Sequence, residues 1–250
     1  MKICVINNMV HFIHFKNNYL FMDKNSRRTV YAGVNYVFAP PVSVKGDARF
    51  ALQKYLDDSD IQITDTKDEQ NKYILTRKTQ MPLEMQILLA PQIGQLLILA
   101  PELGTRSLEY FTKEADEIAS IFERIWGKRQ IIACDATIRD LYGSSSEHAF
   151  QELWEERLQQ PSSSLQPFGR PVLGGGLRFV MPPTSNSPHT PLIEVKIESF
   201  LPDTKKIFLE VQCLWQQPQS PDKSLDPGLK LHFVDDYLMN EVIRFIMMEQ

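Results

Sequence analysis

The stretch that most constrains the fold is Leu192–Trp215, which has the residue pattern of a β-hairpin. Apolar and charged residues alternate in its first half, and apolar residues occupy every second position of its second half. A period of two places the apolar set on one face of a strand. The intervening Pro202-Asp203-Thr204-Lys205 is typical of a turn, because proline presets φ and aspartate bonds its own backbone. We therefore expect an antiparallel sheet with one face covered by helices.

A second, less regular hairpin is predicted within Pro82–Ala100. Polar and apolar residues alternate over Glu84–Leu89, and Pro91-Gln92-Ile93-Gly94 supplies a turn. The return strand, Leu96–Leu99, is apolar on both faces. That pattern is typical of a strand in the interior of a sheet.

The clearest helix is expected between Ser107 and Gly127, which are typical N-cap and C-terminal residues. Apolar residues at alternating steps of three and four form its stripe: Leu108, Phe111, Ala115, Ile118, Phe122 and Ile125. A helix near the C-terminal end has a similar predicted inner stripe: Val234, Leu238, Val242 and Phe245.

Both halves of the chain show the same predicted order of strand, helix, strand, hairpin and helix. The first strands of the two halves are expected at Val30–Phe38 and Gln130–Ala136. This order resembles ferredoxin-like units with an added strand. We therefore predict an α+β fold of two tandem ferredoxin-like modules, each an antiparallel or mixed sheet with helices on one face. One irregular α+β domain, in which the apparent duplication is chance, is the alternative.

The predicted domain boundaries divide the chain into residues 1–28, 29–128 and 129–250. Residues 1–28 are expected to form an N-terminal extension, or a small hairpin that turns at Asn17-Asn18. Within them, the polar and basic stretch Asn25–Arg28 is typical of a linker. The other two segments are expected to be the first and second α+β modules.

Composition and charge argue against several classes of protein. The net charge is −4 and no basic run occurs, so no nucleic-acid surface is expected. No run of about 18 apolar residues exists, so no membrane span is expected. Polar residues interrupt the N-terminal apolar stretch, which argues against a signal peptide. Three cysteines far apart, Cys4, Cys134 and Cys213, fit reduced thiols, and we predict a cytoplasmic protein.

Two short motifs invite a ligand interpretation that their surroundings do not support. Gly174-Gly175-Gly176 is followed by a strand-like stretch, whereas a phosphate loop needs a helix N-terminus. We interpret the glycines as a bulge or as a close approach of another backbone. His11 and His14 face opposite sides of a strand and have no further ligands nearby. We therefore predict no cofactor and no metal.

Four polar residues of the second half are candidate catalytic groups: Asp135, Arg139, His148 and Arg178. They can gather if the strand containing Asp135 lies beside the strand containing Arg178. Such groups would then serve as acid, base or anion-binding residues. The structural alternative is that carboxylates near a helix start are favoured by the helix dipole, and that Arg139 pairs with them.

Two segments resemble those of an uncharacterised bacterial protein family: RQIIACDATIRDLYG (Arg129–Gly143) and GRPVLGGGLRFVMPP (Gly169–Pro183). The resemblance covers the chain from about Val30 onward. It implies tandem ferredoxin-like repeats and a cytoplasmic bacterial setting. It carries over no catalytic or binding residue.

We expect a non-enzymatic binding or assembly module, because two core patterns occur without a convergent catalytic set. The expected partner is an unidentified protein or a second copy of the chain. Sheet edges and faces would make the contact, together with the long loops at Gln159–Phe168, Pro182–Pro191 and Gln216–Leu229. The alternative function is a small-molecule or phosphoester-handling enzyme that uses the four polar residues named above.

Overall fold

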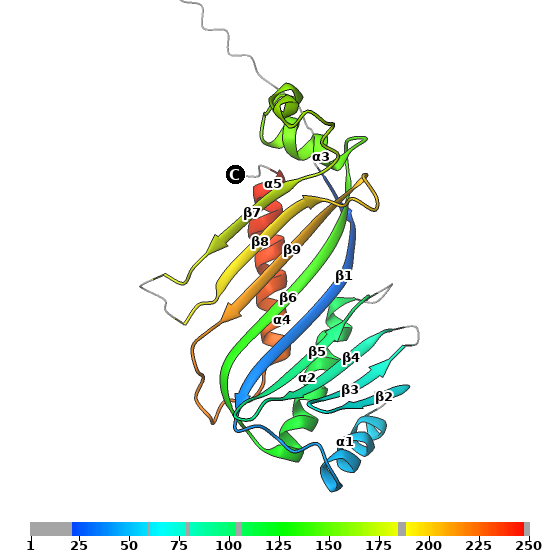
Figure 1. Cartoon of the computed structure of the whole chain (residues 1–250), viewed down its shortest axis with the longest axis vertical. Helices are drawn as coiled ribbons and strands as arrows, with labels where there is room; N and C mark the ends of the chain where they lie inside the picture. Colours follow the sequence, from blue (N-terminus) through cyan, green and yellow to red (C-terminus); the bar gives the residue numbers. More distant parts are fainter. Residues whose placement is uncertain (1–21, 60, 79–80, 104–106, 185–188, 248–250) are drawn as a thin grey trace, which may run out of the picture.

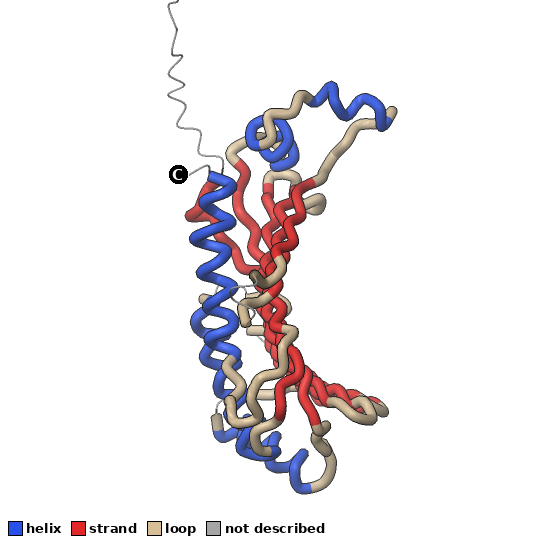
Figure 2. Tube along the Cα trace, turned by 90° about the vertical axis from the view of Figure 1, so that its left-hand side faces the viewer, coloured by secondary structure: helices blue, strands red, loops and turns tan. Residues whose placement is uncertain are grey.

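The computed structural model describes residues 22–59, 61–78, 81–103, 107–184 and 189–247. Its described strands form one nine-stranded sheet in the order β2-β3-β4-β5-β1-β6-β9-β8-β7 (Figure 1). The strands are β1 (Met22–Ala39), β2 (Asp65–Glu69), β3 (Lys72–Arg77), β4 (Leu83–Leu89), β5 (Gly94–Ala100), β6 (Gln130–Ser144), β7 (Gly176–Met181), β8 (Leu192–Ser199) and β9 (Lys206–Trp215). The long helices lie together on one face of this sheet (Figure 2).

The described helices include three segments that are not α-helical. The α-helices are α1 (Asp47–Asp58), α2 (Leu108–Trp126), α3 (Ala149–Gln151), α4 (Pro227–Tyr237) and α5 (Ile243–Met247). The π-helical segment η1 (Glu152–Arg157) continues α3, and the π-helical segment η3 (Leu238–Val242) joins α4 to α5. The segment η2 (Ser162–Phe168) is a 3₁₀ helix.

The centre of the sheet is the antiparallel pair of β1 and β6, which runs from Met22 opposite Ser144 to Ala39 opposite Gln130. This pair joins the strands of the first half of the chain to those of the second half in one continuous sheet. The prediction of two tandem ferredoxin-like modules is therefore wrong. In a ferredoxin-like split βαβ unit another strand lies between the two strands that the helix connects. Here β2 to β5 follow one another as an antiparallel meander, and the first strands of the two halves, β1 and β6, pair with each other. The α+β class itself is confirmed.

Both predicted hairpins are confirmed. Strands β8 and β9 pair directly, with Val195 and Val211 opposite each other and buried. In their turn, Asp203 Oδ1 accepts a hydrogen bond from the backbone N–H of Lys205 at 3.1 Å. Strands β4 and β5 pair in the same way, and β5 lies inside the sheet between β4 and β1.

Helix α2 has the predicted ends and buried stripe. Ser107 Oγ accepts a hydrogen bond from the backbone N–H of Tyr110, and Gly127 ends the helix with φ of 72°. Phe122 packs edge-on against Phe38 of β1, with ring centroids 5.3 Å apart. These contacts place α2 over β1 and β5, where it covers the first half of the sheet.

The C-terminal helical stretch has the predicted inner stripe up to Val242 and then departs from it. Phe245 is 40% exposed, and the neighbouring Ile246 is buried instead. The π-helical segment η3 explains the shift, because its wider turns insert extra residues relative to an α-helix and rotate the residues that follow. The rotation places Phe245 toward the strand β7.

Two of the sequence predictions concern the N-terminal end of the chain. The stretch Asn25–Arg28, predicted as a linker, instead belongs to β1, and its hydrogen-bonding partners lie far along the chain. The predicted hairpin around Asn17-Asn18 lies outside the described residues, as do His11 and His14.

Candidate functional site

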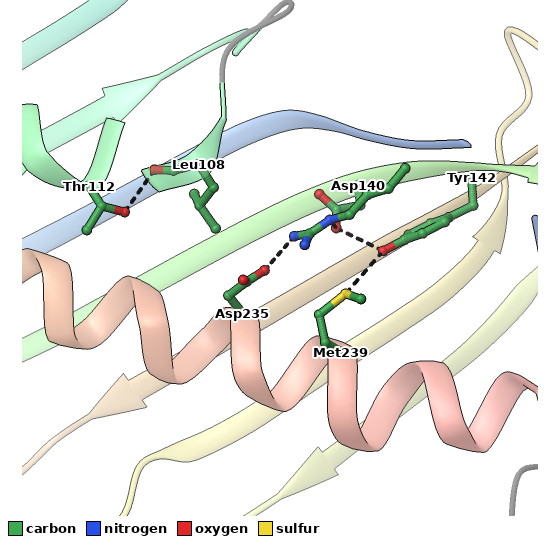
Figure 3. Close-up of polar contacts among 7 residues, drawn as sticks. Leu108, Thr112, Asp140, Tyr142, Asp235 and Met239 are labelled. Carbon is green, nitrogen blue, oxygen red and sulfur yellow. Dashed lines mark hydrogen bonds and ion pairs between the residues drawn. The ribbon is translucent and has the colours of Figure 1, made fainter. Parts of the chain in front are cut away.

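A partly buried ion-pair cluster holds the start of β1 against helix α4. Arg27 donates from Nε to Asp140 Oδ2 of β6 at 2.7 Å, and from Nη2 to Asp235 Oδ1 of α4 at 2.5 Å. The Tyr142 hydroxyl lies 3.3 Å from Asp140 Oδ2 and 3.8 Å from Met239 Sδ. Figure 3 shows these carboxylates, the tyrosine and the methionine between the strands and the helix.

The cluster is structural in character. The Asp140 side chain is fully buried, and burial raises the pKa of its carboxyl, while the Arg27 guanidinium opposes that shift. A buried carboxylate of this kind is held ionised by its paired cation. The sequence does not indicate the role of Arg27, because the polar stretch around it shows no apolar alternation.

The predicted residue Asp135 lies on the sheet face opposite Asp140, here called the outer face. Side chains alternate along β6, so Asp135 and Arg139 share the outer face while Asp140 points toward α4. Asn35 Nδ2 of β1 donates to Asp135 Oδ2 at 2.7 Å, and Gln95 Nε2 of β5 donates to Asn35 Oδ1 at 2.7 Å. Burial raises the pKa of Asp135, and the hydrogen bonds that its carboxyl accepts from Asn35 and Gln212 offset only part of the rise.

Paired charges cross the rest of the outer face. Arg139 and Lys196 each donate to a different oxygen of Glu210, and Arg178 forms an ion pair with Glu194 at 2.9 Å. Burial alone would raise the pKa of Glu210, but the two cations outweigh it and keep the pKa below its ordinary value. Cross-strand pairs of this kind stabilise a sheet. The candidate residues Arg139 and Arg178 thus already form ion pairs with carboxylates on neighbouring strands.

The structure does not bring the four candidate residues into one pocket. Asp135 and Arg139 are separated by four residues of one strand, about 13 Å, and Arg178 lies three strands away on β7. His148 is exposed, immediately before α3, and lines a separate cleft. Among the described residues, no group of three or more histidine, cysteine, aspartate or glutamate side chains is arranged to hold a metal ion.

The glycine motif has the structural role that the sequence favours. A Cβ atom on Gly176 would lie 2.1 Å from the carbonyl oxygen of Ile197, so β7 begins where two backbones come close together. A Cβ atom on Gly175 would lie 3.0 Å from the ring of Phe150. Gly176 opens a strand rather than a helix, and this differs from the context of a phosphate loop.

The cleft lined by His148, here called the α3 cleft, lies between α3–η1 and the segment Ser162–Leu173. Its volume is about 740 Å³. Phe150 and Trp154 form one wall, with their rings stacked at a centroid distance of 5.9 Å. The aromatic wall makes the α3 cleft a candidate ligand site.

A second concave surface, here called the β7 groove, lies between the edge strand β7 and the helices η3 and α5. It has a volume of about 370 Å³, and Phe179, Val180, Tyr237 and Phe245 are among its lining residues. Phe179 and Phe245 meet edge to face at 5.4 Å. Val180 is 51% exposed although it is apolar. Exposed apolar surface beside a sheet edge is typical of an interaction site.

The two edges of the sheet differ in their chemistry. Strand β2, DTKDE, is short and carries four charged residues. Such charges prevent a sheet edge from pairing with another strand. Strand β7, GLRFVM, has one charged residue, Arg178, and Glu194 neutralises it. Among the described strands, the β2 edge is therefore protected by its charges and the β7 edge is open to pairing.

The fold and surfaces define an α+β protein with one antiparallel sheet, an open edge strand and an aromatic cleft. No protein-family model matches the chain, and no curated protein matches it. The resemblance of Arg129–Gly143 and Gly169–Pro183 to an uncharacterised family stays a prediction. Within the described part of the chain, every helix is too short or too polar to cross a membrane.

Proposed function

We propose that this protein is a non-enzymatic assembly module in which two copies associate through their β7 edges. The observation that supports the proposal is the unprotected apolar strand β7 beside the β7 groove. A strand at a sheet edge presents unpaired backbone N–H and C=O groups, which another strand can satisfy. The charged edge β2 is unsuited to the same pairing.

A second copy suits this edge because an antiparallel pair of identical strands forms around a two-fold axis. With the axis at Phe179, the two Phe179 rings face each other on the helix side of the sheet. Leu177 of each copy then lies opposite Met181 of the other, which extends one apolar layer across both molecules. The exposed part of Phe245 borders the same layer. The β7 strand is therefore complementary to itself.

Substitution of Val180 by lysine tests the proposed pairing. Half of the Val180 side chain is already buried, so its remaining burial contributes about 1 kcal/mol per copy. Losing about 2 kcal/mol per dimer weakens association roughly 30-fold. The new lysine would also face the partner's Arg178, which adds repulsion.

Size-exclusion chromatography with light scattering measures the outcome over a range of protein concentration. The wild-type protein is expected to be a dimer at micromolar concentration, and Val180→Lys is expected to be a monomer with unchanged thermal stability. The matched control is Ile93→Lys, a half-exposed aliphatic residue in the β4–β5 turn, which should remain dimeric. A wild-type protein that stays monomeric at high micromolar concentration, with no protein co-purifying, would refute the proposal. A dimer that survives Val180→Lys would assign the interface to another surface.

A further inference from the structure

We propose that the α3 cleft is a binding site for a small planar aromatic or conjugated molecule that carries a negative charge. The site is separate from the proposed pairing, because no residue of β7 lines it. Its volume of about 740 Å³ lies within the range of small-molecule pockets.

The walls of the α3 cleft suit a flat apolar body. Phe150 and Trp154 stack with an interplanar angle of 22° and form a continuous aromatic surface. Across the cleft lie Leu165, Val172 and Leu173, and Leu173 is 74% exposed. An aromatic ligand between these walls would bury surface that is now in contact with water. The hydrophobic effect would stabilise such a complex.

The polar groups of the α3 cleft favour an anion. Its carboxylate, Glu155, already accepts hydrogen bonds from Ser162 Oγ and Gln151 Nε2, and these bonds lower its pKa. The cation Arg170 lines the same cleft, and it forms no ion pair or hydrogen bond with any other described side chain. The α3 cleft therefore offers the cation Arg170 to a ligand's negative charge, and the hydrogen bonds to Glu155 occupy its oxygens without cancelling its charge.

The aromatic wall is held in place before a ligand arrives. Glu152, on the same helical segment, is buried and accepts hydrogen bonds from Ser144 Oγ and from the backbone N–H of Ser145. Gly175 lies close to the Phe150 ring, since a Cβ atom there would come within 3.0 Å of it. Preorganised walls reduce the entropy lost on binding. Trp154 of the wall also lies in the π-helical segment η1, and π-helical turns frequently occur at functional sites.

The β7 groove is a second apolar surface that could bind the same ligand, and its charged lining differs from that of the α3 cleft. Glu241 is the charged residue that lines it within the described part of the chain. A carboxylate at that position disfavours an anionic ligand and leaves a neutral apolar ligand unaffected. A pair of probes of nearly equal shape, one anionic and one neutral, therefore separates the two sites.

The experiment uses 8-anilinonaphthalene-1-sulfonate as the anionic probe and N-phenyl-1-naphthylamine as the neutral one. Probe fluorescence, with energy transfer from tryptophan, reports binding to the intact protein. We expect one saturable site per chain for the anionic probe. Arg170→Gln should weaken that probe about fivefold, as for one exposed charge pair, and leave the neutral probe within about twofold.

Leu173→Asp should weaken both probes at this site about tenfold or more, because it removes apolar contact and adds a like charge. Both substituted residues are exposed, and circular dichroism would check that the variants remain folded. The matched control is Val180→Asp in the β7 groove, which should leave anionic-probe binding unchanged. The proposal is overturned if the anionic probe shows no saturable binding, or if its affinity is the same in Arg170→Gln and Leu173→Asp as in the wild-type protein. Loss of binding in Val180→Asp alone would also overturn it, by assigning the probe to the β7 groove.

Discussion

Replacing Arg27 by methionine should destabilise the fold strongly and in a pH-dependent way. The substitution keeps most of the side-chain volume and removes the cation that lies 2.7 Å from Asp140. The Asp140 carboxylate is fully buried and would remain without its charged partner. Removing one partner of a buried ion pair costs about 3–5 kcal/mol. The Arg27 side chain is 23% exposed, so we expect a loss near the lower end, about 3 kcal/mol.

The sign of the pH dependence follows from the pKa of Asp140. Burial already raises this pKa in the folded protein, and loss of the Arg27 guanidinium, which opposes burial, raises it further. At a pH between the pKa of Asp140 in the unfolded chain and its higher pKa in the folded variant, the folded variant therefore binds more protons than the unfolded chain. Its stability relative to wild type therefore falls as pH rises through the folded pKa, and recovers as pH falls toward the unfolded value of about 4.

Urea denaturation followed by tryptophan fluorescence measures this effect at about pH 5 and about pH 8. We expect a clearly larger loss of unfolding free energy at the higher pH. The control is the double variant Arg27→Met with Asp140→Asn, which removes the buried charge as well. That variant should regain about 2 kcal/mol at the higher pH. A loss below about 1 kcal/mol, or an equal loss at both pH values, would refute the argument.

Two further predictions concern buried polar groups. The Arg77 guanidinium donates two hydrogen bonds to the Glu114 carboxylate, at 2.6 and 2.8 Å, and the two side chains are 5% and 9% exposed. Glu114→Gln removes the negative charge from this pair and should lower the free energy of unfolding by about 3 kcal/mol. An unchanged midpoint in urea denaturation would contradict this. Burial raises the pKa of Cys213 to about 12 and that of Cys134 further, so in a Cys4→Ser protein a thiol reagent at neutral pH should modify neither residue until the chain is unfolded. Rapid modification of the native protein would show that one thiol is accessible.

Local elements of the fold were predictable from the sequence, whereas their assembly was not. The two hairpins and helix α2 follow from alternation, turn residues and the cap at Ser107, all of which are local signals. The pairing of β1 with β6 joins Arg27 to a partner 113 residues away. No local pattern encodes such a partner. The stretch Asn25–Arg28 has the sequence pattern of a linker for the same reason, since its strand conformation depends on pairing with β6.

The candidate site was predictable only in part. A period of two correctly places Asp135 and Arg139 on one face of a strand. The sequence does not indicate that Asp135 accepts a hydrogen bond from Asn35 of β1, or that Arg139 donates one to Glu210 of β9. The aromatic wall around Trp154 is not evident from the sequence, because an aromatic residue at helical spacing is typical of a core face. The π-helical turns change which side chains face the interior.

The central pair of β1 and β6 has a consequence for how the chain acquires its fold. Contacts between residues so distant in sequence require closure of a long loop, which slows folding. The strands β2 to β5 can pair locally while β1 still has one unsatisfied side. Helix α4, which anchors Arg27 through Asp235, lies beyond residue 226 and leaves the ribosome late. During synthesis the nascent chain therefore exposes β1 as a temporary sheet edge, and chaperone protection matters most in that interval.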